Sequence, residues 1–374
     1  MVDAIYLDYN ATSPLSPSVI NYIKEGMIRD WANPSSEHDA GYEKAIEIRK
    51  SRSRIADFLG CSTSQITFTS GATESINTVL SADTLASLGV KTVITSPMEH
   101  HATLDRAKYL ETKGFHIKMV RTLPTGSLDY DHLDHLASFS KKAIISLLYT
   151  NNETGIINDV KKISSISQRH GCLVHIDAVQ ALGKIKFSLN ELEVDFASFS
   201  GHKIGSLKGI GMLYRKQHEI VPLMHGGGQE KALRPGTYNL PGIKSIEMAI
   251  SDIDFDAIEK RGYEARFAIE QLFKQIFPSA IVNGAECDRV YNTISLAIPE
   301  HSSKAIMLGM SRSGIYISTG SACSSGIEVG SHVLKEFTEF EKNSIRISFS
   351  ISMLDPSVIH TISMKLNDYK VKSI

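Results

Sequence analysis

Short β-rich runs alternate with amphipathic helical stretches from the start of this chain to about residue 250. The runs that we predict as strands cover residues 66–69, 92–95, 143–148, 173–176, 196–199 and 211–214. Helical patterns separate several of them, for example Asp159 to His170. This alternation predicts a mostly parallel sheet with helices on both faces. Ligands bind at the carboxyl ends of such strands, so polar residues that directly follow a strand are the first candidates for function.

The pattern changes after about residue 250. A long helical stretch runs from Ile253 to about Phe277, and two further β-like runs cover Asn292 to Ile298 and Ser344 to Phe349. Helical pieces surround these runs, which predicts a second, smaller α+β domain. A length of 374 residues agrees with two domains of unequal size.

The composition excludes several classes of protein. Hydrophobic residues make up 42% and charged residues 22%, ordinary values for a globular chain that exclude a disordered or coiled-coil one. The net charge of −1 offers no electrostatic reason to bind nucleic acid. No apolar run is long enough to cross a bilayer, and residues 1–8 lack the pattern of a signal peptide. We therefore expect a cytoplasmic protein without membrane contact.

Common nucleotide and metal motifs are missing. The sequence has no GxxxxGKS/T and no GxGxxG that opens a helix after a strand, which disfavours P-loop enzymes and nicotinamide dehydrogenases. HExxH and GxSxG are absent too. Asp252, Asp254 and Asp256 lack the Gly and the distal Glu of a calcium loop, so we interpret them as a solvated helix start and predict no metal site.

Small and hydroxyl residues follow the first predicted strand. Ser70, Gly71, Ala72 and Thr73 open a helix at this point. Free N–H groups and hydroxyls at a helix N-terminus can bind an anion. The same residues also fit a helix that is merely well capped, and this segment alone leaves both interpretations open.

Two other strand ends carry an acid and a lysine. Asp177 ends one run, where a buried carboxylate is costly without a cationic partner. Lys203 comes shortly after another run, behind Ser200 and His202. Taken alone, Asp177 fits a turn and Lys203 fits a surface position. Together with an anion pocket they form the set that pyridoxal phosphate (PLP) requires: a lysine for the Schiff base, an acid against the pyridinium nitrogen and donors for the phosphate.

Two further strand ends add polar groups. His100 and His101 follow the second run, where a histidine could stack on an aromatic cofactor and carry protons. A lone histidine is more often structural. Asn151 and Asn152 follow the third run, where an amide could bind a ring hydroxyl, although Asn-rich turns are common without function.

Cys323 lies in a stretch of small residues from Ser318 to Gly326, which predicts a mobile loop with a thiol in its middle. A nucleophilic cysteine needs access and a way to become a thiolate. Cys61, Cys172 and Cys287 lie beside a helix end, before a buried strand and in a polar turn, and we interpret them as inert. Four cysteines without a CxxC pair predict neither a zinc knuckle nor a disulfide framework.

These motifs resemble those of the cysteine desulfurases of the NifS/IscS type, within the class V aminotransferase group, over nearly the whole chain. The resemblance rests on residues 6–12, 33–36, 70–75 (SGATES), 99–100, 151–153, 177–180, 200–203 (SGHK), 234–237 (RPGT), 320–326 (GSACSSG) and 344–346. It implies an α/β fold, the PLP-dependent transferase fold type I. The large PLP-binding domain would cover residues 14–255, and a small domain of residues 1–13 and 256–374 would carry the cysteine loop.

The resemblance implies roles position by position. Lys203 would hold PLP and move the Cα proton, Asp177 would pair with the pyridinium nitrogen, and Gln180 would bind the ring hydroxyl. His100 would stack on the ring and assist proton transfer. The phosphate would be bound by Gly71, Ala72, Thr73, Ser200 and His202, while Thr237 would reach the phosphate of the neighbouring subunit in a homodimer. The substrate carboxylate would be held by Asn33, Asn152 and Arg346, and Asn152 would also contact the cofactor. A guanidinium suits a carboxylate because it can form two hydrogen bonds with it.

The implied reaction converts L-cysteine to L-alanine. The Cys323 thiolate would attack the substrate sulfur and keep it as a persulfide for a protein acceptor, either an iron–sulfur scaffold or a tRNA-thiolation protein. Two alternatives stay open: another class V PLP enzyme, such as an aminotransferase or a selenocysteine lyase, and a PLP-fold partner in sulfur relay. Residues 206–207 and 347–350 depart from the family pattern, which leaves the acceptor and the rate open.

Overall fold

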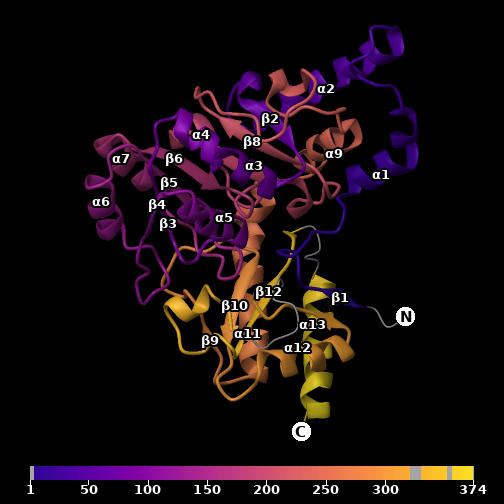
Figure 1. Ribbon diagram of the computed structural model, residues 1–374. Helices are drawn as coiled ribbons and strands as arrows, with labels where there is room; N and C mark the ends of the chain where they lie inside the picture. The colour runs from indigo at the N-terminus through magenta and orange to yellow at the C-terminus, as the bar shows by residue number, and fades with distance from the viewer. Residues whose placement is uncertain (1–3, 321–329, 352–355, 374) are drawn as a thin grey trace.

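The computed structural model describes residues 4–320, 330–351 and 356–373, so Cys323 lies outside the described residues. The chain forms two parts that the colours of Figure 1 separate: an upper part from indigo to pink and a lower part from orange to yellow. Strand β1 (Ile5–Tyr6), near the start of the chain, lies in the lower part although its colour is indigo. Within the described ranges, no helix has both the length and the apolar character needed to cross a bilayer.

The upper part is built on a seven-stranded sheet with the order β2-β8-β7-β6-β5-β3-β4. Its strands are β2 (Ile66–Thr69), β3 (Thr92–Thr95), β4 (His116–Met119), β5 (Ala143–Leu148), β6 (Leu173–Asp177), β7 (Phe196–Ser200) and β8 (Gly211–Arg215). Strands β3 to β7 pair in parallel, while β8 is antiparallel to both β2 and β7. The predicted mostly parallel sheet is confirmed. Strand β4 was not predicted, because it is a partly exposed edge strand without an apolar run.

Helices cover both faces of this sheet. One face is covered by α2 (Asp39–Leu59), α6 (Tyr130–Ser138), α7 (Val160–His170) and α9 (Leu240–Ser251), and the other by α3 (Ala72–Val79), α4 (Ala82–Ser87) and α5 (His101–Thr112). Successive residues of a strand point to opposite faces, and Ile144 and Ile145 accordingly belong to different hydrophobic clusters. Two buried faces explain why the strands are continuous apolar runs. The short helices α1 (Pro17–Glu25) and α8 (Leu189–Leu192) complete this part.

The lower part holds an antiparallel sheet with the order β12-β10-β9, and β1 pairs in parallel with β11. Its strands and helices are β9 (Ile281–Val282), β10 (Thr293–Ala297), β11 (Ile315–Tyr316), β12 (Ser344–Ser348), α10 (Phe255–Ala257), α11 (Tyr263–Ile276), α12 (Ser303–Arg312) and α13 (Pro356–Ser373). The helix predicted from Ile253 to Phe277 is interrupted by a π-helical turn, η5 (Ile258–Gly262). The Asp254 carboxylate caps α10 by accepting from the Ala257 N–H at 2.9 Å, which agrees with the predicted helix start.

Two sets of hydrophobic residues meet near residue 253. Ile5 and Leu7 pack into the same cluster as residues from Ile258 to Leu366, whereas Ile253 contacts this cluster and the main cluster of the upper part. The N-terminal segment therefore shares its core with the C-terminal part of the chain. The domain bounds at residues 13/14 and 255/256 stay a prediction.

Candidate active site

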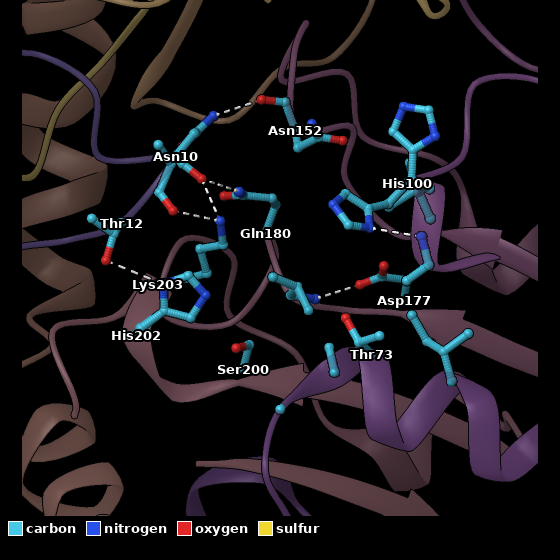
Figure 2. Close-up of a pocket in the computed structure, with 18 of the residues that line it drawn as sticks. Asn10, Thr12, Thr73, His100, Asn152, Asp177, Gln180, Ser200, His202 and Lys203 are labelled. Atoms are coloured by element: carbon cyan, nitrogen blue, oxygen red, sulfur yellow. Dashed lines mark hydrogen bonds between the residues drawn. The ribbon is translucent and has the colours of Figure 1, made fainter. Parts of the chain in front are cut away.

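A cavity of about 650 Å³ lies at the carboxyl ends of the sheet strands, where the two parts of the molecule meet (Figure 2). A cavity of this size suits a small-molecule ligand. The predicted site residues that line it are Gly71, Ala72, Thr73, His100, Asn152, Asp177, Gln180, Ser200, His202, Lys203 and Arg346. Thr237 instead lines a neighbouring cavity of about 160 Å³, and Asn33 is exposed before α2. Cys323 lies outside the described residues.

Lys203 and Asp177 approach the cavity from opposite sides in Figure 2. Lys203 ends the short turn η3 (Gly201–Lys203) directly after β7, and its Nζ donates to the backbone carbonyls of Asn10 at 2.6 Å and Ala11 at 2.8 Å. Asp177 is the last residue of β6, and one carboxylate oxygen accepts from the Val179 N–H at 3.0 Å. The parallel strands thus bring together an amine and an acid that are distant in sequence.

Asp177 is a buried acid without an ion-pair partner among the described residues. Burial raises the pKa of this carboxyl to about 6, while the Val179 N–H and the charge of Lys203 act in the opposite direction. A buried carboxylate of this kind is stabilised when a cation is placed against it. The protonated ring nitrogen of the predicted cofactor would be such a cation.

The raised pKa of Asp177 predicts a stability effect that can be measured without any ligand. Because the pKa lies above its usual 3.8, ionisation destabilises the ligand-free fold; this cost is absent below about pH 4 and complete above about pH 6. We expect Asp177→Asn to raise the free energy of unfolding of the PLP-free protein by about 3 kcal/mol near neutral pH, and by little near about pH 4. Urea unfolding at both pH values checks this, with the exposed Asp256→Asn as the matched control. Equal stability of Asp177→Asn and wild type near neutral pH would show that burial of the ionised carboxylate does not destabilise the fold.

Hydrogen-bond donors gather at the lower end of the cavity, where α3 begins. Helix α3 starts at Ala72, so its first N–H groups are available to an anion. The Ser200 hydroxyl lies beside this loop, since a Cβ added to Gly71 would be 3.8 Å from its oxygen. Close packing holds the loop in place: a Cβ on Gly211 of β8 would come within 2.5 Å of the Gly71 Cα. Thr73 and His202, also predicted to bind the phosphate, line the same cavity.

Two histidines that line the cavity, His100 and His202, are neutral near neutral pH. Burial, helped by the nearby Lys203 charge, lowers the pKa values of His100 and His202 to about 4. His100 caps α5, where its Nδ1 accepts from the Ala102 N–H at 3.1 Å. The proton of the neutral ring is therefore on Nε2. His202 Nδ1 lies 3.2 Å from the Thr12 hydroxyl.

Arg346 brings a cation from β12 to the same cavity. Its guanidinium is 3% exposed; Nη2 donates to the Asp8 carboxylate at 2.8 Å and Nη1 to the Asn152 carbonyl at 3.2 Å. Its buried Nε has no partner among the described residues. A buried guanidinium beside a ligand cavity is suited to a carboxylate, which it can bind with two hydrogen bonds.

Asn10 is a site residue to which sequence reasoning gave no role. It is 2% exposed, and its carbonyl accepts from both Gln180 Nε2 and Lys203 Nζ. Its Nδ2 donates to the Asn152 carbonyl at 3.1 Å and the Thr293 hydroxyl at 2.9 Å. Asn10 thus joins the N-terminal segment, the sheet ends and the lower part. Its place in the motif at residues 6–12 was the available signal, but no local pattern reveals such distant partners.

Glu153 was also missed, and it connects the cavity to the cysteine segment. This buried carboxylate lines the cavity and accepts from the Ser331 hydroxyl. A Cβ on Gly320 would lie 2.9 Å from the same carboxylate. The described residues on both sides of residues 321–329 therefore contact Glu153, and His332, one residue further, lines the cavity.

The three described cysteines lie away from this cavity. Burial raises the pKa of the Cys61 thiol to about 12, and the pKa of Cys172 also lies above its usual value. The Cys287 thiol donates to the Thr125 carbonyl at 3.4 Å. These positions agree with the interpretation of the three thiols as inert.

Comparison with known proteins agrees with this geometry. A family model described as class V aminotransferase matches residues 5–358. The cysteine desulfurase IscS of Dictyoglomus turgidum is 36% identical over 369 residues, which cover 96% of this chain and 93% of that protein. A solved structure of a NifS-like protein is similar with a TM-score of 0.85 and 33% identity, covering 98% of both chains. A structure of SspA in complex with cysteine has a TM-score of 0.81 and 28% identity, covering 92% of this chain and 98% of that one. These matches confirm the predicted resemblance and fold class.

Proposed function

This chain belongs to the class V aminotransferase family, and from that membership we propose that it is a cysteine desulfurase that takes sulfur from L-cysteine onto Cys323 and releases L-alanine. One observation carries the proposal. Lys203 and Asp177 line the same cavity as His332, which closely follows the segment that contains Cys323. The cavity that would hold the cofactor and the amino-acid substrate therefore lies next to the chain segment that contains the thiol.

The cavity residues fit pyridoxal phosphate, the cofactor of this family. The buried Asp177 carboxylate lines the cavity and suits a cationic ring nitrogen, and the N–H groups at the start of α3 suit a phosphate. The remaining groups that would hold the cofactor are Lys203, Gln180, His100, Thr73, Ser200 and His202. When bound, the cofactor withdraws electrons from the substrate and so makes its Cα proton acidic.

Lys203 and His100 are the groups that move protons. Lys203 Nζ takes the Cα proton and later returns a proton to the product, and the Asn10 and Ala11 carbonyls hold this nitrogen in the cavity. His100 presents a neutral ring whose Nε2–H is available as a hydrogen-bond donor, which suits it to assist the proton transfer at Lys203. Arg346 and Asn152 would hold the substrate carboxylate at the opposite end of the cavity from α3.

The sulfur leaves on a protein acceptor. The Cys323 thiolate attacks the substrate sulfur and forms an S–S bond while the substrate Cβ–S bond breaks. The electron pair of that bond stays on the carbon side, which takes up a proton and leaves as alanine. The outer sulfur of the Cys323 persulfide then passes to an iron–sulfur scaffold or a tRNA-thiolation protein in the cytoplasm. Gly320 and Ser331, on either side of the segment 321–329, lie close to the Glu153 carboxylate, which lines the cavity, and this supports delivery from a thiol of the chain itself.

The active form that we propose is a homodimer. Thr237 does not line the main cavity of its own chain, and the resemblance implies that it reaches the phosphate held by the neighbouring subunit. Ile28 is 84% and Trp31 is 78% exposed, close in sequence to Asn33. Two large apolar side chains at this exposure favour a contact surface. Burial of Trp31 in a dimer would also cover the segment that carries Asn33.

The role of Cys323 is tested with sulfur-labelled L-cysteine. PLP-loaded protein is incubated with the labelled substrate without reductant, and the label bound to protein is measured before and after addition of dithiothreitol. We expect wild-type protein to carry label that the reductant releases, and Cys323→Ala to carry only background label. Cys287→Ala, which removes a partly exposed thiol outside the cavity, should behave like wild type. Label retained by Cys323→Ala at the wild-type level would refute the proposed carrier.

A further inference from the structure

Lys184 carries a buried amine that contacts two residues of the cavity wall, Asn10 and Gln180. It has no role in the proposed reaction. It is 7% exposed and has no carboxylate within ion-pair distance among the described residues. Burial, together with the Lys203 and Arg346 charges, holds the pKa of Lys184 well below its usual range. A lysine without an acid partner in such a position is costly, so its contacts must explain why it is there.

Lys184 Nζ has two hydrogen-bond acceptors. It donates to Asn10 Oδ1 at 3.0 Å and to Oε1 of Gln180, four residues earlier in the chain. Gln180 and Lys184 belong to the same turn, in which the Lys184 N–H donates to the Ala181 carbonyl at 3.0 Å. All three polar side chains are buried.

These contacts fix the orientation of the Gln180 side-chain amide. Oε1 faces Lys184, which donates hydrogen bonds in either protonation state, and Nε2 faces the Asn10 carbonyl at 3.1 Å, which can only accept. Both neighbours select the same amide orientation. Nε2 has a second hydrogen, and Gln180 lines the cavity (Figure 2). The amide therefore offers a donor to a ligand, whereas the flipped amide would offer a lone pair.

We propose that Lys184 is a positioning residue that holds the Gln180 amide with its N–H donor toward the ring oxygen of the cofactor. This inference rests on the proposed PLP-dependent function, since the ring oxygen belongs to that cofactor. Without Lys184, Gln180 Oε1 would be a buried acceptor without a donor, and the amide would gain by turning Oε1 elsewhere. Lys184 acts through Gln180, so its effect should vanish when Gln180 is removed.

The test is a double-mutant cycle on PLP affinity. The variants are Lys184→Met, which keeps the chain length and removes the donor, Gln180→Ala, and the combination of the two. The dissociation constant of PLP is measured by equilibrium dialysis of cofactor-free protein, and the absorbance maximum of the bound cofactor is recorded. We expect each single variant to weaken PLP about tenfold, the value of one hydrogen bond, and the double variant to match Gln180→Ala within about twofold. Lys186→Met, on an exposed side chain, is the matched control and should match wild type.

A merely structural lysine would give a different result. Additive losses, about a hundredfold in the double variant, or a Lys184→Met protein with wild-type affinity and absorbance, would overturn the inference. Gln180→Glu keeps Lys184 in place as the partner of the new carboxylate and presents only acceptors to the cavity. It should bind PLP more weakly than Gln180→Ala, and wild-type affinity here would also overturn the inference. A wild-type protein that binds no PLP would overturn the proposed function itself, and this inference with it.

Discussion

The Lys203→Ala protein is expected to form alanine from L-cysteine about 10³-fold more slowly than wild type, because the group that takes and returns the Cα proton is missing. The loss should appear in kcat rather than in the KM for cysteine, since Arg346 and Asn152 remain. Alanine is quantified by chromatography in single-turnover reactions with excess PLP. Lys216→Ala, on an exposed side chain, is the matched control and should keep wild-type activity.

Small amines separate proton transfer by Lys203 from a purely structural effect. A primary amine such as ethylamine can enter the space left by the truncated side chain and accept the Cα proton. We expect it to restore part of the activity of Lys203→Ala, with a rate that rises with amine concentration. Wild-type activity in Lys203→Ala without added amine would contradict the role of Lys203.

Arg346→Ala is expected to lower kcat/KM for L-cysteine about a hundredfold, because a buried ionic contact with the substrate carboxylate is lost. Most of the loss should appear in KM, while the affinity for PLP stays within a few fold of wild type. Arg346→Lys keeps the charge but not the two-pronged guanidinium, so its loss should be smaller, about tenfold. Steady-state kinetics of both variants give these values.

Cysteamine provides the control for Arg346, since it is cysteine without the carboxylate. Wild-type protein should prefer cysteine to cysteamine strongly, as measured by sulfide release with a reductant. The preference should nearly disappear in Arg346→Ala. If Arg346→Ala retains the full preference, the substrate carboxylate binds elsewhere and the role assigned to Arg346 is wrong.

Most of the sheet and much of the candidate site could be predicted from the sequence, for a physical reason. Strands buried on both faces are continuous apolar runs, which makes β3, β5, β6 and β7 easy to locate. The carboxyl ends of parallel strands meet at one edge, so residues that follow them come together without further information. Asp177 and Lys203 were found in this way, and both line the cavity.

The features that were missed depend on contacts between distant residues. Asn10 bonds to residues more than a hundred positions away, such as Asn152 and Thr293, and no local pattern encodes this. The sequence around Lys184 is typical of an exposed lysine beside a turn, and only the structure shows that this lysine is buried. The π-helical turn at Ile258–Gly262 interrupts a helix that the apolar pattern made continuous. A Cβ on Gly262 would meet the Tyr291 ring at 2.9 Å, a packing constraint that comes from another part of the chain.

The most direct test of the proposed function is the stoichiometry of products from L-cysteine. Wild-type protein loaded with PLP is given L-cysteine and a thiol reductant, and alanine and sulfide are measured in the same samples over time. The proposed reaction predicts equal amounts of alanine and sulfide, many turnovers per protein, and no need for a keto acid. Alanine without sulfide, pyruvate in place of alanine, or no product from a protein that has bound PLP would contradict cysteine desulfurase activity.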